Sequence, residues 1–166
     1  MTKIIEGNLI TLAQQGKFDI IVHGCNCFAT MGAGIAVAIK KAFPEAYKAD
    51  IKHYPAKRTK SRLGTISGGE VLLPESGKIL FVINAYTQYT PGPDFRLYAL
   101  KDCLWELKEL ISELQHQAGY GMAGKKIQVG FPKIGAGIGG GDWNQIKPLI
   151  ESELSDVCDL TFVYFK

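Results

Sequence analysis

Two segments of the chain combine polar residues with glycine in a pattern that can hold an anion. The first reads HGCNCFATMGAGIA over residues 23–36, and the second reads FPKIGAGIGGGDW over residues 131–143. In each segment a short apolar run leads through glycines into a helical pattern, so free backbone N–H groups coincide with the positive end of a helix dipole. Two such loops at the carboxyl ends of parallel strands could bind a diphosphate from both sides.

His23, Cys25 and Cys27 are the residues of the first segment that could bind a metal or act as a Cys/His nucleophile. No second pair of closely spaced Cys or His residues completes a tetrahedral metal site, so we predict neither a metal nor another cofactor. A nucleophilic Cys needs a base and an electropositive environment. Buried, reduced thiols are therefore the default for both cysteines, and a Cys/His enzyme stays an alternative.

Length and composition indicate one globular domain. The chain has 166 residues, of which 46% are apolar and 21% are charged. The formal net charge of +3 suits a small anionic ligand and is too small to indicate nucleic acid as a partner. No signal peptide opens the chain, and no apolar run reaches the roughly 18 residues that cross a bilayer. We expect a soluble, cytoplasmic protein with reduced thiols and no membrane partner.

One basic segment, KRTKSR at residues 57–62, stands apart from this pattern. We interpret it as a solvated loop, and a patch that binds phosphate or nucleic acid is the alternative.

Short runs rich in Val, Ile and Phe have the length of buried strands. These predicted strands span residues 3–6, 19–23, 70–73, 78–85, 126–131 and 160–165. Helices are predicted over 33–43, before Pro44, over about 94–114, where apolar residues recur at spacings of three and four, and over about 142–154, with Asp142 as N-cap. Strands that alternate with helices predict an α/β sandwich with a largely parallel sheet.

The two glycine segments, together with EGNL at 6–9 and VINAY at 82–86, resemble a macro domain. The resemblance covers nearly the whole chain and implies a single macro domain over residues 1–166. It also implies a three-layer α/β/α fold, in which a mixed, mostly parallel sheet of about six strands lies between helices. The segments are most similar to the branch that includes the yeast-type ADP-ribose 1''-phosphate phosphatases, and the implied ligand is ADP-ribose at the carboxyl ends of the central strands.

The resemblance also implies roles for individual residues. Asn26 matches the residue that contacts the distal ribose, His23 matches a histidine of the phosphatase branch, and both are candidate catalytic residues. Asn8 stands where the family usually has an Asp that binds adenine, and Tyr164 or Phe165 is expected to border adenine. The full set of predicted ligand-binding residues is Asn8, Leu9, Gly32, Ala33, Gly34, Ile35, Asn84, Tyr86, Gly135, Ala136, Gly137, Ile138, Gly139, Gly140 and Tyr164.

Three functions are open at this point. The leading hypothesis is hydrolysis of ADP-ribose 1''-phosphate by a protein expected to be a monomer, with His23 as general acid or base; the alternative for His23 is a core histidine. The second is hydrolysis of ADP-ribosyl-protein or O-acetyl-ADP-ribose, and the third is a non-catalytic ADP-ribose reader. One macro-domain subgroup removes ADP-ribose from proteins with a Lys and an Asp, at positions that align here with Ala85 and Gly139. The absence of both residues counts against the second hypothesis.

Overall fold

The computed structural model describes residues 2–117 and 122–166, and its strands form one six-stranded sheet. The strands are β1 (Thr2–Gly7), β2 (Ile20–Cys25), β3 (Ile66–Leu72), β4 (Ile79–Tyr86), β5 (Gln128–Phe131) and β6 (Asp159–Phe165). Their order across the sheet is β1-β6-β5-β2-β4-β3. Neighbouring strands are parallel except for β3, which pairs antiparallel with β4 at one edge. The predicted mixed, mostly parallel sheet is confirmed.

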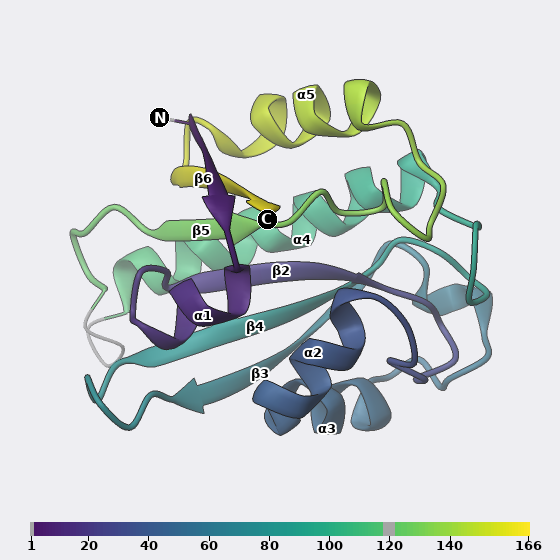
Figure 1. Cartoon of the computed structure of the whole chain (residues 1–166), viewed down its shortest axis with the longest axis horizontal. Helices are drawn as coiled ribbons and strands as arrows, with labels where there is room; N and C mark the ends of the chain where they lie inside the picture. The colour runs from purple at the N-terminus through teal and green to yellow at the C-terminus, as the bar shows by residue number, and fades with distance from the viewer. Residues whose placement is uncertain (1, 118–121) are drawn as a thin grey trace.

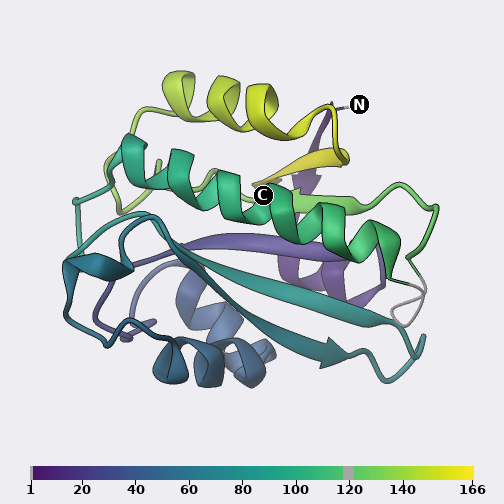
Figure 2. The same ribbon diagram turned by 180° about the vertical axis from the view of Figure 1, so that it is seen from behind.

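Helices cover both faces of the sheet, as the prediction of three layers requires (Figures 1 and 2). One face carries α1 (Leu9–Gln14), α2 (Ile35–Ala42) and α3 (Pro44–Lys52), and the other carries α4 (Leu97–His116) and α5 (Trp143–Leu154). A short 3₁₀ helix, η1, spans Lys60–Arg62.

The central strand β2 shows why the sheet is sandwiched in this way. Ile20 and Val22 pack into the core under α4 and α5, whereas Ile21 packs into the core under α1, α2 and α3. Successive side chains of a strand point to opposite faces, so a run without polar residues must be covered on both sides. Such burial fixes the carboxyl end of β2 between β5 and β4.

Two helices are absent from the predictions, α1 and α3. The α1 helix has only six residues and begins at the N-cap Asn8, whose Oδ1 accepts from the N–H groups of Ile10 and Thr11. Pro44 ends the predicted helix over 33–43, but it is also the first residue of α3, a position where a missing N–H costs nothing. Asp142 caps α5 as predicted, accepting from the N–H of Asn144 at 2.9 Å.

The basic segment 57–62 is only partly the solvated loop that we expected. Lys57, Arg58 and Lys60 are exposed, but Arg62 is fully buried and its guanidinium donates to Asp50 at 3.1 Å. A buried arginine needs a partner for its charge, and the buried carboxylate of Asp50 supplies it.

Elsewhere, all four cysteines are buried and free. Among the described residues, no helix is both long and apolar enough to cross a bilayer.

Candidate functional site

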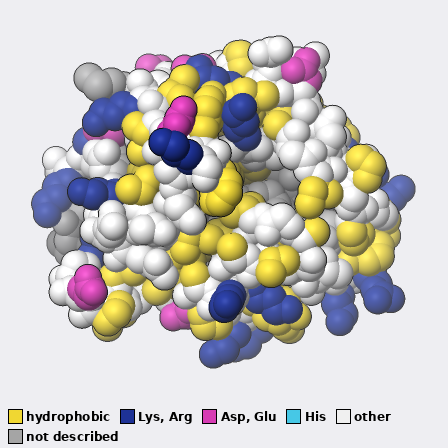
Figure 3. All heavy atoms as spheres, in the orientation of Figure 1, with side chains coloured by type: hydrophobic (Ala, Val, Ile, Leu, Met, Phe, Trp, Pro, Cys, Tyr) yellow, Lys and Arg dark blue, Asp and Glu magenta, His cyan; other side chains and the backbone are white. Residues whose placement is uncertain are grey.

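A cavity of about 960 Å³ opens where the carboxyl ends of β2, β5 and β6 meet the amino ends of α1 and α2. Figure 3 shows the surface hollowed near the centre of the corresponding face. The two glycine segments form opposite walls, because one follows β2, the other follows β5, and these strands are neighbours. The fold therefore brings together two loops that lie about one hundred residues apart in the sequence.

The wall after β2 ends at the amino terminus of α2. Gly34 is the N-cap residue. Its φ of 58° is a backbone angle that residues other than glycine rarely adopt. The backbone N–H groups of Ile35 and Ala36 donate to no residue in the described part of the chain. These N–H groups and the helix dipole make this wall favourable for an anion.

Asn26 lines the same end of the cavity, and its side chain shapes the loop. Its Oδ1 accepts from the N–H of Phe28 at 2.8 Å, and its Nδ2 donates to the hydroxyl of Thr30 at 2.8 Å. Ala29 and Met31 hold positive φ angles of 58° and 40°, which cost free energy at residues with side chains. Asn26 thus stabilises a strained loop at the cavity edge.

The wall after β5 consists of the second glycine loop. Gly135 has a φ of 74°, and a Cβ there would lie 2.3 Å from the Phe95 ring, so only glycine fits. The N–H of Gly141 donates to the carbonyl of Gly135 at 2.7 Å and closes the loop. By contrast, the N–H groups from Gly137 to Gly139 donate to no described residue, and a Cβ at Gly137 would contact nothing.

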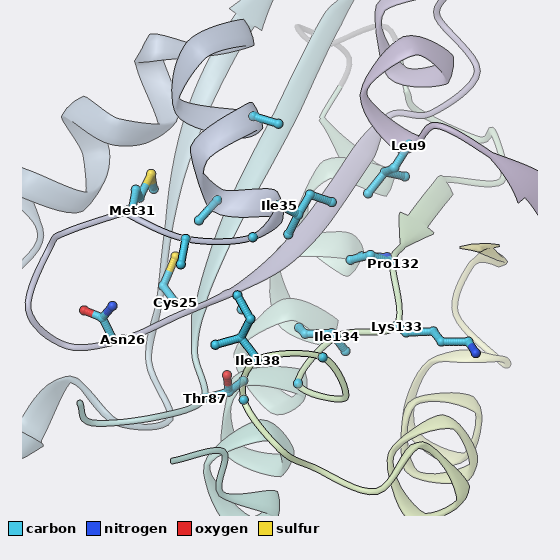
Figure 4. Close-up of a pocket in the computed structure, with 18 of the residues that line it drawn as sticks. Leu9, Cys25, Asn26, Met31, Ile35, Thr87, Pro132, Lys133, Ile134 and Ile138 are labelled. Carbon is cyan, nitrogen blue, oxygen red and sulfur yellow. The ribbon is translucent and has the colours of Figure 1, made fainter. Parts of the chain in front are cut away.

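The far end of the cavity is lined by Asn8, Tyr164 and Phe165. The Tyr164 hydroxyl accepts from the indole N–H of Trp143 at 2.9 Å, and the Lys133 ammonium lies 4.4 Å from the centre of the Tyr164 ring. Because Oδ1 of Asn8 caps α1, only its Nδ2 is left to reach a ligand. Figure 4 shows Lys133 and Leu9 on this side and Asn26 on the other.

His23 lies behind the cavity rather than in it. Its side chain is fully buried, and its Nε2 lies 2.7 Å from Oδ1 of Asn84. Burial lowers the pKa of His23 from 6.5 to about 4, so the imidazole is neutral at neutral pH. The expectation that His23 acts as a general acid or base does not fit this position, and the alternative of a core histidine does.

Asn84 and Tyr86 belong to the same buried polar network. Asn84 Nδ2 donates to the Ala46 carbonyl and to the hydroxyl of Ser67. The Tyr86 hydroxyl lies 2.9 Å from the Ser67 hydroxyl and donates to Asp50 at 2.7 Å. Both side chains are fully buried, so they connect the sheet to α3 and do not reach the cavity.

The structure therefore divides the predicted site residues. Those outside the cavity lining are His23, Asn84, Tyr86, Ala136 and Gly140. Those that line it are Asn8, Leu9, Asn26, Gly32, Ala33, Gly34, Ile35, Gly135, Gly137, Ile138, Gly139 and Tyr164.

Thr87 and Gln88 line the cavity as well. They directly follow β4, whose carboxyl end adjoins that of β2, and they belong to the stretch 84–88 that the resemblance matches with the loop beside the distal ribose. Ala85, which we aligned with a family position after the fourth strand, lies inside β4 and is buried.

Neither thiol nor metal chemistry is evident in the cavity. Cys25 lines it, but burial raises the pKa of this thiol well above its usual value, so no thiolate forms near neutral pH. Within the described residues, no group of three or more His, Cys, Asp or Glu side chains is arranged to hold a metal ion.

Comparison with known proteins gives a family match and several relatives. A family model described as Macro domain matches residues 22–150. An uncharacterized 17.5 kDa protein of Enterobacteria phage T4 is 37% identical over 92% of this chain and 89% of its own length. An ADP-ribose 1''-phosphate phosphatase of Candida albicans is 27% identical over 98% of this chain and 97% of that protein.

A DNA ADP-ribosyl glycohydrolase of Thermus aquaticus is 24% identical over 93% of this chain, but the match spans only 38% of that protein. The solved structure of the macrodomain of T. aquaticus DarG is similar with a TM-score of 0.74, at 24% identity over 99% of this chain and 97% of that one. At this identity the likeness shows the fold.

Proposed function

This chain belongs to the macro-domain family, and on that premise we propose that it binds ADP-ribose in the cavity between its two glycine loops. We take residues 1–166 as a single macro domain. The ligand fits the chemistry of the cavity, which offers amide donors in the middle and aromatic rings at one end.

The observation that supports this proposal most strongly is the pair of facing walls with unpaired amides. Ile35 and Ala36 present N–H groups from one wall, and Gly137 to Gly139 present them from the other. A diphosphate between the walls accepts hydrogen bonds from both, and the α2 dipole favours its negative charge. Within the described residues, no acceptor of the chain itself forms a hydrogen bond with these N–H groups.

The two ends of the cavity set the direction of the ligand. Tyr164 and Phe165 offer aromatic surface for adenine at one end, where Nδ2 of Asn8 can donate to a ring nitrogen. The distal ribose then lies at the opposite end, beside Asn26.

The reaction that we propose is hydrolysis of ADP-ribose 1''-phosphate to ADP-ribose and phosphate. A phosphate on the distal ribose lies near the loop that Asn26 stabilises. Phosphoryl transfer passes through a loose transition state, so positioning and electrostatic stabilisation supply most of the catalysis. Loop amides and Asn26 can do this work without proton transfer by His23, whose pKa is too low.

The test measures phosphate release from ADP-ribose 1''-phosphate beside calorimetric binding of ADP-ribose. Binding together with turnover supports the phosphatase. Binding without turnover makes the chain an ADP-ribose reader. O-acetyl-ADP-ribose serves as a second substrate, because its hydrolysis is the alternative reaction, in which Asn26 would position a water. Absence of ADP-ribose binding contradicts the proposal as a whole.

A second candidate function, cleavage of ADP-ribose from nucleic acid, is favoured by the charge beside the Asn26 loop. Residues 40–62 contain eight Lys or Arg and two acidic residues. The Arg58 guanidinium lies 5.6 Å from the Phe28 ring centre, and the Lys60 ammonium lies 5.5 Å from that of Tyr89. Exposed cations beside aromatic rings suit phosphates and bases of a single strand.

A double variant, Arg58→Gln with Lys60→Gln, tests this second function. If the leaving group is nucleic acid, the variant loses most activity on an ADP-ribosylated DNA oligonucleotide and keeps its affinity for free ADP-ribose. The matched control is Lys3→Gln with Lys101→Gln, two exposed lysines on β1 and α4. Wild-type protein without activity on the oligonucleotide, or equal effects of both double variants, contradicts the second function.

A further inference from the structure

The outer face of α4 carries two large aromatic side chains that are more than half exposed. Trp105 is 63% exposed and Tyr98 is 58% exposed. Two helical turns separate them, so both project from the same side of the helix. The other side of α4 packs into the core through residues such as Leu104 and Leu107. Trp and Tyr are enriched at protein interfaces, because each buries a large apolar area and offers a polar atom at its tip. Tyr98 and Trp105, the aromatic stripe, therefore form a candidate docking surface.

Few contacts within the chain involve the aromatic stripe. Among the described residues, the Trp105 side chain forms no hydrogen bond and no ring contact. The Tyr98 hydroxyl accepts from the Arg96 guanidinium at 3.1 Å, and the rest of the side chain stays exposed. Figure 2 shows α4 on the face turned toward the viewer, whereas the binding cavity opens on the opposite face, which Figure 3 shows. A partner that covers the aromatic stripe therefore leaves the cavity open.

Charged side chains flank the aromatic stripe, and the two flanks differ in sign. Successive residues of a helix are about 100° apart around its axis. Lys101 and Lys108 therefore lie on one flank, and Asp102 and Glu109 lie on the other. Lys108 pairs with Glu153 of α5 at 3.6 Å. The other three side chains form no ion pair in residues 2–117 and 122–166, so their charges are available to a partner.

This charge pattern matches a second copy of the same face in one orientation. A two-fold axis parallel to α4 makes the two helices run parallel and brings opposite flanks together. Lys101 then lies opposite Asp102 of the second copy, and the reverse contact repeats across the axis. A two-fold axis perpendicular to α4 makes the helices antiparallel and brings like flanks together. Lysine would then face lysine across the interface, which costs free energy.

We propose that α4 forms the interface of a homodimer, in which the aromatic stripes of two copies pack together and the helices run parallel. The inference does not depend on ADP-ribose, and it departs from the expectation of a monomer. Two Trp and two Tyr side chains bury roughly 600–1,000 Å² together. A standard interface buries roughly 1,600 Å². We therefore expect a reversible dimer with a dissociation constant of about 10–100 µM.

Sedimentation equilibrium at chain concentrations from about 5 to about 500 µM measures this association. The mass of wild type should rise with concentration from that of a monomer toward that of a dimer. Trp105→Glu places a charge at the centre of the contact, and we expect a loss of affinity of at least about tenfold. The unfolding temperature should stay at the wild-type value, because Trp105 is largely exposed in the single chain. The matched control is Ile51→Glu, an exposed position of α3 on the opposite face, which should dimerise like wild type.

Exchange of charges tests the parallel orientation. Lys101→Glu sets two acidic side chains opposite each other, and Asp102→Lys sets two lysines opposite each other. Each change acts twice in a symmetric interface, so either variant should weaken the dimer roughly three- to tenfold. The double variant restores opposite charges and should dimerise about as well as wild type.

Three results overturn the inference. They are a wild-type chain that stays monomeric at the highest concentration, a dimer that Trp105→Glu leaves intact, and equal weakening by Trp105→Glu and Ile51→Glu. Stronger association of Lys101→Glu overturns the parallel orientation, because only an antiparallel pair has repulsion between lysines to relieve. Absence of ADP-ribose binding by wild type contradicts the proposed function and leaves the dimer standing.

Discussion

The Nε2 atom of His23 lies 2.7 Å from Oδ1 of Asn84, and both side chains are completely buried. The Asn84 amide nitrogen donates to the Ala46 carbonyl and to Ser67, so its oxygen is the acceptor toward His23. The neutral imidazole therefore carries its proton on Nε2. A histidine held in one tautomer behind the cavity stabilises the contact between β2 and β4 instead of moving protons in a reaction.

This burial makes the stability of the protein depend on pH. The pKa of His23 is about 4 in the folded protein and 6.5 when exposed, so between these values the unfolded chain binds more protons. The free energy of unfolding should therefore fall as pH falls, by roughly 2 kcal/mol between pH 7 and pH 5. Urea denaturation at the two pH values measures this loss.

The variant His23→Gln isolates the contribution of this one group, since glutamine can still donate to Asn84 and does not titrate. We expect the variant to lose most of the difference between pH 7 and pH 5. The same variant should show a turnover profile from pH 6 to pH 8 parallel to that of wild type. A hundredfold loss of turnover with intact binding would restore His23 as an acid or base and contradict our interpretation.

The glycine loops illustrate how much of the site could be predicted. Both loops follow buried strands, and a rule for parallel sheets places such loops together at the carboxyl edge. Residues such as Gly34 and Gly137 could thus be assigned to one cavity from local pattern alone, and the structure places both in its lining. The largely parallel sheet also followed from the pattern, because runs of β-branched and aromatic residues alternate with segments of helical periodicity. Its mixed character was implied only by the resemblance.

Side-chain direction could not be predicted for residues at strand ends. His23, Asn84 and Tyr86 lie in segments that lead to the cavity, but their side chains point to the face under α3 or into the core. A polar residue in a strand points to one of two faces, and only the partner across the sheet decides which. Asp50 and Ser67, the partners in question, lie far away in sequence. Asp50 is in α3, which was not predicted, and Ser67 is in the first part of β3, ahead of the predicted strand 70–73.

The buried pair of Arg62 and Asp50 yields a second prediction. Arg62→Met removes the guanidinium that donates to Asp50 at 3.1 Å and leaves the carboxylate buried with only the Tyr86 hydroxyl. Breaking a buried pair from one side costs about 3–5 kcal/mol. We expect a loss of that size in urea denaturation, with part of it recovered when Asp50→Asn is added. A loss below about 1 kcal/mol, the value of an exposed pair, would contradict this role.

Ligand binding should not need a divalent metal. The only carboxylate among the described lining residues is Asp50, and Arg62 already pairs with it. Magnesium usually binds through one or two free carboxylates together with phosphate oxygens. ADP-ribose affinity measured by calorimetry should therefore be the same with and without a chelator. A marked loss of affinity in the chelator, reversed by added magnesium, would show that a metal bridges the ligand to the chain.

Asn26 should affect both binding and turnover. Its amide holds Phe28 and Thr30 in the loop, at 2.8 Å in each case, and Asn26→Ala removes both hydrogen bonds. We expect a loss of roughly tenfold in ADP-ribose affinity and a further loss in turnover, because the distal ribose is no longer held in place. Thr30→Val removes one of the two bonds and should give an intermediate affinity. Wild-type affinity in Asn26→Ala would mean that the loop is fixed without this side chain.

Substitutions at Gly137 and Gly135 should have different effects, the first on ligand binding and the second on stability. A Cβ at Gly137 meets no atom within 4 Å and its φ is not positive, so Gly137→Val should leave the free energy of unfolding nearly unchanged. The branched side chain occupies the space beside the loop amides, and we expect ADP-ribose affinity to fall at least tenfold, a loss of about 1.4 kcal/mol. Gly135→Ala is the matched control, because its Cβ would overlap the Phe95 ring at 2.3 Å. Gly135→Ala should lower the free energy of unfolding. Any loss of ADP-ribose affinity in this variant should follow from that destabilisation. Equal losses of stability and affinity in Gly137→Val would mean that this glycine serves the loop itself and that the diphosphate lies elsewhere.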